Sequence, residues 1–124
     1  MMDSLKKALD TFTLDQIDIP AVALSIDVKD HAVESPTHRH RKGQLVVALQ
    51  GAVMCRTEKG IWMVPPRCGM WIPGGIAHGN GITSNGRMCF LFVDPSVTGL
   101  PEECSTLSLS SMLIEMILYM AQPH

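Results

Sequence analysis

Short apolar stretches separated by turn-forming residues constrain the fold of this chain more than any other feature. They cover residues 21–28, 44–51, 52–58, 61–64, 70–73 and 87–94. β-Branched and aromatic side chains are frequent in these stretches, and glycine, proline or asparagine bounds them. This pattern is typical of an all-β sandwich or barrel. We therefore predict a mainly β fold with antiparallel strands.

Prolines and glycines locate the reversals between these stretches. The sequence EKG at 58–60 predicts a tight hairpin, with Gly60 at the position that needs a positive φ. Gly43 and Gly51 are also interpreted as turn glycines. The paired prolines at 65–66 exclude a central strand at that point, and the sequence PGG at 73–75 forces another reversal.

Both ends of the chain have a helical pattern. Residues 3–12 predict a short helix, so that residues 1–20 form an N-terminal helix and lead-in. Within residues 99–124, the sequence MLIEMILYMAQ repeats apolar residues with a helical period. Ser110 or Ser111 can cap the N-terminus of this second helix.

The C-terminal helix is apolar around most of its circumference, so another surface has to cover it. Its own β domain is one candidate, and a partner subunit or further domain is the other. We predict a homodimer in which this helix contributes to the interface, because the apolar band is broad for one face of a barrel to hide. The candidate interface residues are Leu113, Ile114, Ile117, Leu118 and Met120.

Composition excludes several classes of protein. The chain has 124 residues, 46% of them hydrophobic, and a formal net charge of −2, as expected for one globular domain. No apolar run is long enough for a membrane span, and the start of the chain has no hydrophobic signal core. The four cysteines show neither CxxC spacing nor the density of a disulfide scaffold. We therefore predict reduced thiols and a cytoplasmic protein without membrane contact.

Basic residues concentrate in the middle of the chain. Between residues 37 and 87, Glu58 is the one acidic residue. This excess of positive charge favours anions near the middle of the chain, or it solvates exposed strand faces. Arg39 and Arg41 alternate with histidines, so in a regular strand they point away from the face that the histidines share.

Histidines provide the main candidate site. His38 and His40 share one face of a strand, and Gln44 has the same parity as His40. His78 follows MWIPGGIAHGN, where proline and glycine shape a turn that presents the imidazole. Imidazole is the commonest metal ligand, and a site with three protein ligands leaves a position for water or substrate. The alternative is an empty polar pocket in which the rings bind each other or water.

At these residues the sequence resembles the cupins. Their first motif, with His-x-His followed by a glutamate, corresponds to His38, His40 and Gln44. The histidine of their second motif, Pro-x-Gly-x-x-His, corresponds to His78. The resemblance implies a jelly-roll-like cupin β-barrel over residues 21–98 and a divalent transition metal such as zinc or nickel on those four residues. Glutamine replaces the carboxylate, and the asparagine expected after the last histidine is displaced to Asn80.

A narrower resemblance covers nearly the whole chain. The segment HRHRKGQLVVALQGAVMCRTEKGIWMVPPRCGMWIPGGIAHGN is similar to the sensor domain of a branch of AraC-family transcription regulators, in which glutamine is the usual residue at the position of Gln44. This resemblance implies a domain that senses a small-molecule or metal effector and dimerises. DNA would be bound by a C-terminal helix-turn-helix domain that begins where this chain ends, at His124. We therefore expect no DNA binding by this chain alone.

The two tryptophans have two possible positions. We predict that Trp62 and Trp71 fill the barrel or line the rim of a ligand pocket.

An enzyme is the alternative to a sensor domain. It would be a small metal-dependent cupin enzyme: an isomerase, dioxygenase or lyase. Catalysis needs an acid or base beside the metal, and Glu58, which lies in a predicted turn, is a poor candidate. We therefore predict a regulatory domain without catalytic residues.

Overall fold

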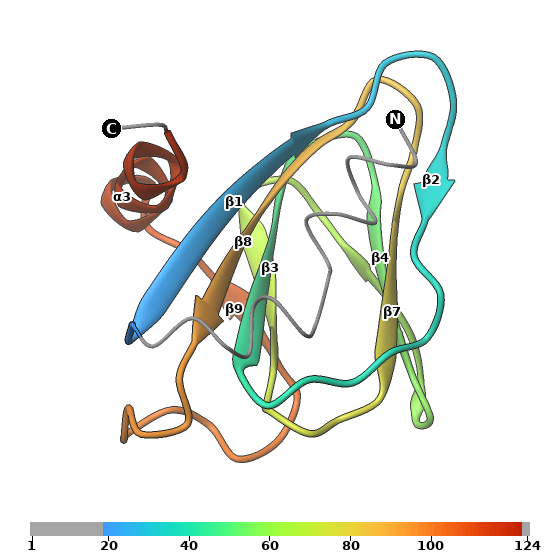
Figure 1. Ribbon diagram of the computed structural model, residues 1–124. Helices are drawn as coiled ribbons and strands as arrows, with labels where there is room; N and C mark the ends of the chain where they lie inside the picture. Colours follow the sequence, from blue (N-terminus) through green and yellow to red (C-terminus); the bar gives the residue numbers. More distant parts are fainter. Residues whose placement is uncertain (1–18, 123–124) are drawn as a thin grey trace.

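The computed structural model describes residues 19–122, which form two β-sheets that face each other and one helix (Figure 1). The predicted N-terminal helix lies outside the described residues. The strands are β1 (Ala21–Asp27), β2 (Val33–Glu34), β3 (Gly43–Gln50), β4 (Val53–Thr57), β5 (Gly60–Val64), β6 (Cys68–Ile72), β7 (His78–Ile82), β8 (Arg87–Val93) and β9 (Ser105–Ser108). The helix is α3 (Ser111–Ala121).

The chain passes repeatedly from one sheet to the other. The five-stranded sheet has the order β1-β8-β3-β6-β9, and the four-stranded sheet has the order β2-β7-β4-β5. Neighbouring strands are antiparallel in both sheets. The sheets do not close into one barrel, so the predicted barrel is realised as a jelly-roll-like sandwich.

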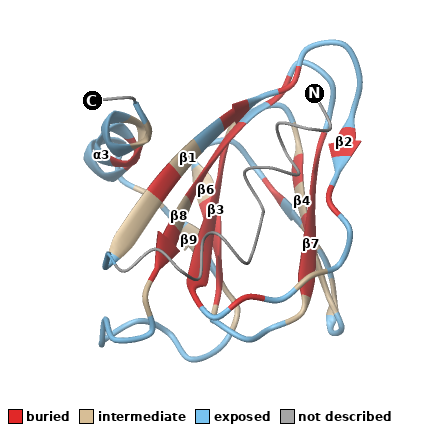
Figure 2. Cartoon of the chain, viewed as in Figure 1, coloured by how far each residue is buried: buried red, intermediate tan, exposed pale blue. Residues whose placement is uncertain are grey.

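The inner faces of the two sheets enclose the main hydrophobic core. Val46 of β3, Phe90 and Phe92 of β8 and Ile72 of β6 are fully buried there, together with Val53 of β4. Buried residues follow β3, β7 and β8 along most of their length (Figure 2). Both sheets are therefore fixed against each other at the strands that carry the candidate site.

A second hydrophobic cluster lies on the outer face of the five-stranded sheet, beneath α3. Because successive side chains in a strand point to opposite faces, Leu45 and Val47 of β3 point away from the main core. Ile114 and Ile117 of α3, each 1% exposed, pack against this outer face. The helix lies beside β1 (Figure 1), and the Ser110 Oγ caps it by accepting from the Leu113 N–H at 3.1 Å.

Most of the strands were predicted from the sequence. The six apolar stretches correspond to β1, β3, β4, β5, β6 and β8, with small shifts at their ends. Strands β2, β7 and β9 were not predicted. Gly60 has the expected positive φ, at 147°, and Gly51, which was interpreted as a turn glycine, has a φ of 77°. The interpretation of Gly43 was wrong, because this residue lies in β3, where a side chain would collide with the Trp71 indole.

The structure also changes the interpretation of the C-terminal helix. Ile114 and Ile117 were predicted to lie at a partner interface, but they contact the chain's own sheet, and Leu118 packs there as well. The physical reason is that β3 is apolar on both faces, so its outer face also needs a cover. Leu113 and Met120 remain exposed, beside the packed face of the helix. No helix among residues 19–122 is long and apolar enough to cross a membrane.

The packing of α3 generates a stability prediction. Replacing Ile117 by alanine is expected to lower the free energy of unfolding by about 2–4 kcal/mol, because it leaves a cavity beneath the helix. Glu115→Ala, at an exposed position of the same helix, should change it by less than about 0.5 kcal/mol. Urea unfolding followed by circular dichroism measures both. Equal losses in the two variants would show that the helix does not use Ile117 to pack on the sheet.

Candidate functional site

Three imidazole rings meet beside the first residues of β3 and β7. His38, His40 and His78 each offer a ring nitrogen, and these nitrogens lie within 4.8 Å of one another. The ring centroids are 4.5 Å apart for His38 and His78 and 4.8 Å apart for His40 and His78. His40 and His78 are buried, and His38 is half-buried. The structure therefore brings together the three histidines that the sequence singled out.

A short bridge between distant segments aligns two of the rings. The His38 N–H donates to the His78 carbonyl and the His78 N–H donates to the His38 carbonyl, both at 2.8 Å. His40 lies in the turn before β3, where its carbonyl accepts from the Gly75 N–H at 2.8 Å. The expected regular strand through both histidines is absent here, since β3 begins at Gly43. Contacts between segments, rather than strand alternation, place His40 beside His38.

Each ring contacts a backbone carbonyl through Nδ1. The acceptors are the carbonyls of Pro36 for His38, Lys42 for His40 and Ile76 for His78, at 2.8, 2.6 and 2.7 Å. A carbonyl oxygen can only accept, so the proton of each neutral ring belongs on Nδ1. All three Nε2 atoms are then left as lone-pair acceptors.

Gln44, the second residue of β3, completes the site. Its Oε1 lies 3.1 Å from His40 Nε2 and 2.9 Å from His78 Nε2. With the protons on Nδ1, these contacts join acceptor to acceptor and are repulsive unless a cation lies among them. A half-turn of the carboxamide would instead point its NH₂ group at both rings. Gln44 can therefore serve the site in two ways, as a ligand oxygen or as a donor to the free imidazoles.

Burial favours the neutral form of two of the rings, those of His78 and His38. It lowers the pKa of His78 to about 4, an effect that the hydrogen bond to Ile76 partly opposes and that the neighbouring rings of His38 and His40 reinforce. Burial also lowers the pKa of His38. Metal ligation requires neutral imidazole, so these rings are in the ligating form at neutral pH.

The donor set fits a divalent transition metal. Imidazole nitrogen suits zinc, copper, iron and nickel, and a glutamine oxygen is a neutral, weaker ligand than a carboxylate. His38 Nε2 is buried and has no hydrogen-bond partner among the described residues, which is the state of a ligand atom that a cation would satisfy. Three imidazoles and one amide oxygen therefore converge on a point that can hold a metal ion.

The two tryptophans lie on different faces. Trp62 of β5 packs partly buried against the main core, on the inner side of the sandwich. Trp71 of β6 belongs to the cluster beneath α3, on the outer face of the five-stranded sheet. Trp71 therefore neither fills the interior between the sheets nor lines the histidine pocket (His38, His40, His78 and Gln44), the two positions predicted as alternatives. Its place in β6, opposite Leu45, points it away from Gln44.

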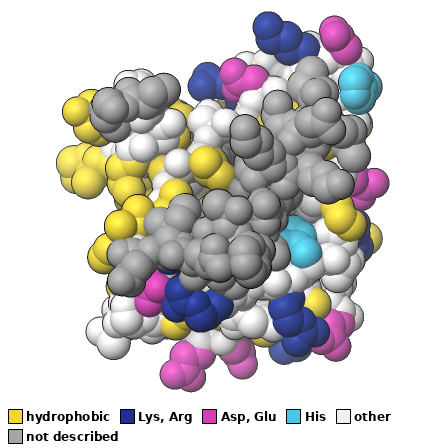
Figure 3. All heavy atoms as spheres, in the orientation of Figure 1, with side chains coloured by type: hydrophobic (Ala, Val, Ile, Leu, Met, Phe, Trp, Pro, Cys, Tyr) yellow, Lys and Arg dark blue, Asp and Glu magenta, His cyan; other side chains and the backbone are white. Residues whose placement is uncertain are grey.

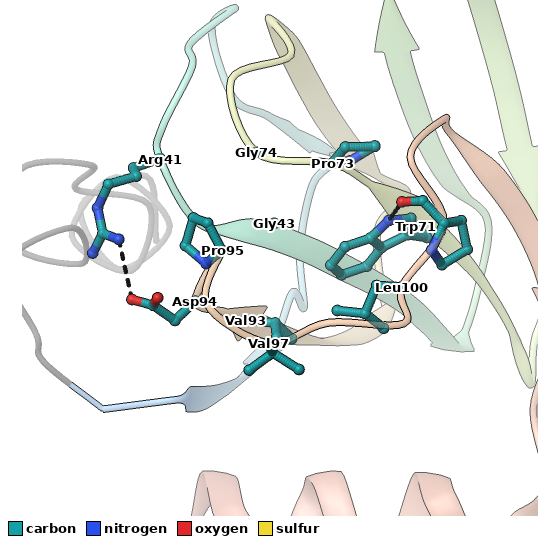
Figure 4. A pocket seen from close by; sticks show the side chains of 11 residues that line it. Arg41, Gly43, Trp71, Pro73, Gly74, Val93, Asp94, Pro95, Val97 and Leu100 are labelled. Atoms are coloured by element: carbon teal, nitrogen blue, oxygen red, sulfur yellow. Dashed lines mark hydrogen bonds and ion pairs between the residues drawn. The ribbon is translucent and has the colours of Figure 1, made fainter.

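Trp71 instead forms part of a shallow groove on the outer face (Figure 4). The groove has a volume of about 230 Å³ and also contains Gly43 and Leu100. At one end Arg41 forms an ion pair with Asp94 at 3.1 Å, and the Trp71 Nε1–H donates to the Pro101 carbonyl at 2.8 Å. The polar groups of Trp71 and Arg41 are thus engaged within the chain.

Lys42 and Asn80 have positions that were not predicted from the sequence. Lys42 belongs to the basic run but is fully buried, with Nζ 3.2 Å from the Ile19 carbonyl and 3.5 Å from Asp94 Oδ2. Asn80 is fully buried on the same strand as His78. The displaced cupin asparagine was the only sequence signal that pointed to Asn80.

Comparison with known proteins relates most of the chain to a regulator. The chain is 48% identical over 101 residues to the HTH-type transcriptional regulator NimR of Escherichia coli (strain K12). The match covers 82% of this chain and 37% of NimR, so the chain spans little more than a third of this relative. No protein-family model matches the chain.

Solved structures identify the fold. An RmlC-like cupin from Shewanella frigidimarina superposes with a TM-score of 0.55 and 19% identity, over 62% of this chain and 68% of that protein. The chain has the cupin fold. Oxalate decarboxylase of Bacillus subtilis, which has Mn(II) centres, superposes with a TM-score of 0.53 and 20% identity, over 77% of this chain and 26% of the enzyme. At these identities the cupin likeness establishes the architecture alone.

The buried imidazoles generate a pH prediction. The pKa of His78 in the folded chain, about 4, lies below the ordinary value of 6.5. Between these values the unfolded chain binds a proton that the folded chain does not, so acid favours unfolding. The free energy of unfolding of the metal-free chain should fall by on the order of 3 kcal/mol from this ring as the pH drops through that window.

Urea titrations near neutral pH and at about pH 4.5 measure this loss. The control is His78→Gln, which has no ionisable ring at that position and should lose less stability on acidification. An identical loss in the variant would show that His78 does not contribute the pH dependence.

Proposed function

We propose that this chain is the effector-sensing and dimerisation domain of an AraC-type transcription regulator. The observation that carries the proposal is the similarity to a helix-turn-helix regulator over most of a chain whose cupin fold gathers three histidines. DNA binding would then belong to a separate helix-turn-helix domain, and this chain alone would not bind DNA. Such a regulator works in the cytoplasm.

In this proposal the histidine pocket holds a metal ion and the effector. His38, His40 and His78 supply Nε2 ligands, and Gln44 supplies a weaker oxygen ligand or a hydrogen bond from its amide. Zinc or nickel suits this set, with metal–nitrogen distances of roughly 2.0–2.1 Å. A bound metal would act as a Lewis acid that attracts a donor atom of the effector.

Sensing is favoured over catalysis by the side chains near the pocket. Among the described residues, none of the buried polar side chains is a carboxylate. Glu58 is exposed in the turn between β4 and β5, as its sequence position predicted. An isomerase, dioxygenase or lyase would therefore have no buried carboxylate as acid or base at this site among the described residues, so that a histidine would have to serve as the base.

The exposed face of α3 supports the proposed homodimer. Met112 and Met116, which lie one turn apart, are 73% and 56% exposed, and Tyr119 is 65% exposed on the next turn. Leu113 and Met120 extend this face. Hydrophobic side chains gather on the side of the molecule where α3 lies (Figure 3). Burying each of the larger ones is worth roughly 1.5–3 kcal/mol, which favours pairing with a second copy.

Metal uptake tests the proposed function. The wild-type chain incubated with zinc or nickel and desalted should retain about one ion per chain, and His38→Ala combined with His40→Ala should abolish the uptake. His31→Ala is the matched control, because His31 is exposed and lies outside the site. Gln44→Glu should bind the metal more tightly by adding a carboxylate. Elemental analysis showing equal uptake by the double variant would place the ion elsewhere.

Sedimentation tests the proposed dimer. Met116→Glu should convert the dimer to a monomer that keeps the circular dichroism spectrum of the parent, because the substitution puts a charge on the exposed face of α3. Glu115→Gln, on the same helix, is the control and should remain dimeric. A monomeric parent, or a dimer that survives Met116→Glu, would contradict an interface on this face.

A further inference from the structure

Asn80 has a buried side chain that the fold does not use. It is 0% exposed, and neither its Oδ1 nor its Nδ2 has a hydrogen-bond partner among the described residues. Buried carboxamides are almost always paired within a protein, because an unpaired donor or acceptor loses its bonds to water without replacement. Both ends of this carboxamide therefore call for a partner that the described chain does not provide.

The backbone holds Asn80 in place without help from its side chain. The Asn80 N–H donates to Ser35 Oγ at 2.9 Å, and the Ser35 N–H donates to the Asn80 carbonyl at 2.8 Å. On the other face of β7, Gly79 and Gly81 leave room for Arg56 and for the side chains of Glu34 and Met54. The backbone of Asn80, and with it the face of β7 from which the carboxamide projects, is thus fixed by the strand.

This carboxamide lies on the same face of β7 as the imidazole of His78. The two residues are two positions apart in one strand, so their side chains point the same way and are separated by roughly 6.6 Å along it. In the neighbouring strand, Asn80 is paired with Cys55, whose buried thiol faces the main core. Burial raises the pKa of that thiol to about 12, so Asn80 has a neutral neighbour there.

We propose that Asn80 is a second recognition point of the histidine pocket and binds an effector that carries an N–H group beside a carbonyl oxygen, as in a carboxamide or a lactam. This inference rests on the proposed function, because it assigns a chemical class to the effector of the same pocket. The Asn80 Nδ2 donates to the effector carbonyl and the Asn80 Oδ1 accepts from the effector N–H, so both unpaired atoms are satisfied together.

Other classes of small molecule satisfy this site less completely. A carboxylate has only acceptors, so it would face the Asn80 Oδ1 with another oxygen. A protonated amine has only donors and would leave Nδ2 without a partner. A hydrocarbon would leave both atoms unpaired, and a site built to hydrogen-bond a ligand discriminates strongly against an analogue that lacks the group.

Two matched fragments test the proposal on the whole chain. Nicotinamide has a pyridine nitrogen and a carboxamide, and 3-acetylpyridine keeps the ring and the carbonyl but lacks the N–H donor. Ligand-observed NMR titrations would measure their dissociation constants for the zinc-incubated and the metal-free chain at millimolar concentrations. We expect nicotinamide to bind wild type about tenfold or more tightly than 3-acetylpyridine.

Substitutions at Asn80 separate recognition from a structural role. Asn80→Leu and Asn80→Ala should both abolish the preference for nicotinamide. Gln50→Leu, which removes an exposed carboxamide at the end of β3 far from Gln44, should retain it. Asn80→Leu should also raise the Tm of the metal-free chain above that of Asn80→Ala and of wild type, because it replaces two unpaired polar atoms by apolar groups of similar size.

Each remaining outcome would overturn the proposal. These outcomes are the absence of nicotinamide binding, the absence of a preference in wild type, and a preference that survives both substitutions. A structural role for the carboxamide would instead lower the Tm of both variants and leave the preference unchanged. Zinc uptake by wild type and variants is scored separately, so a failure of the metal site is distinguishable from a failure of the assignment to Asn80.

Discussion

Hydrogen bonds between imidazole Nδ1 atoms and backbone carbonyls determine what the histidine pocket can do. The Nδ1 atoms of His38, His40 and His78 contact the carbonyls of Pro36, Lys42 and Ile76. Carbonyl oxygens cannot donate, so each neutral ring carries its proton on Nδ1. The lone pairs of Nε2 then face the same region as Gln44. A cluster of acceptors in a buried place is unfavourable on its own, and a cation or the rotated Gln44 amide relieves it. The capacity of the site to bind a ligand through Nε2 therefore follows from the backbone carbonyls that contact the three Nδ1 atoms.

Strand β3 connects this pocket to the rest of the molecule. Gln44 and Val46 face the interior between the sheets, while Leu45 and Val47 face the layer beneath α3. Strand β3 therefore lines the pocket with one face and packs against α3 with the other. Gly43 allows the Trp71 indole to lie across the start of this strand, which a side chain at that position would prevent.

Much of the fold could be predicted from the sequence, and the exceptions have physical causes. The apolar stretches form strands because each strand of the two-sheet sandwich needs apolar side chains on the faces that it buries. The β7 segment HGNGI was missed because its two glycines have low strand propensity, yet Arg56 and Met54 pack over the space that they leave. The histidine cluster followed from motif spacing, but the side of the sheet that Trp71 faces and the face of α3 that packs depend on three-dimensional contacts. Asn80 became visible only through its burial and its unpaired atoms.

The central claim is that the backbone fixes the three imidazoles in one tautomer, with Nε2 free for a ligand. Two-dimensional ¹H–¹⁵N correlation of the imidazole rings in the metal-free chain, at a pH where the rings are neutral, measures this directly. We predict that His38, His40 and His78 all show the Nδ1–H tautomer and that their Nε2 resonances shift when zinc is added. An Nε2–H tautomer at His40 or His78 would mean that the ring donates to Gln44 instead, and it would contradict the account.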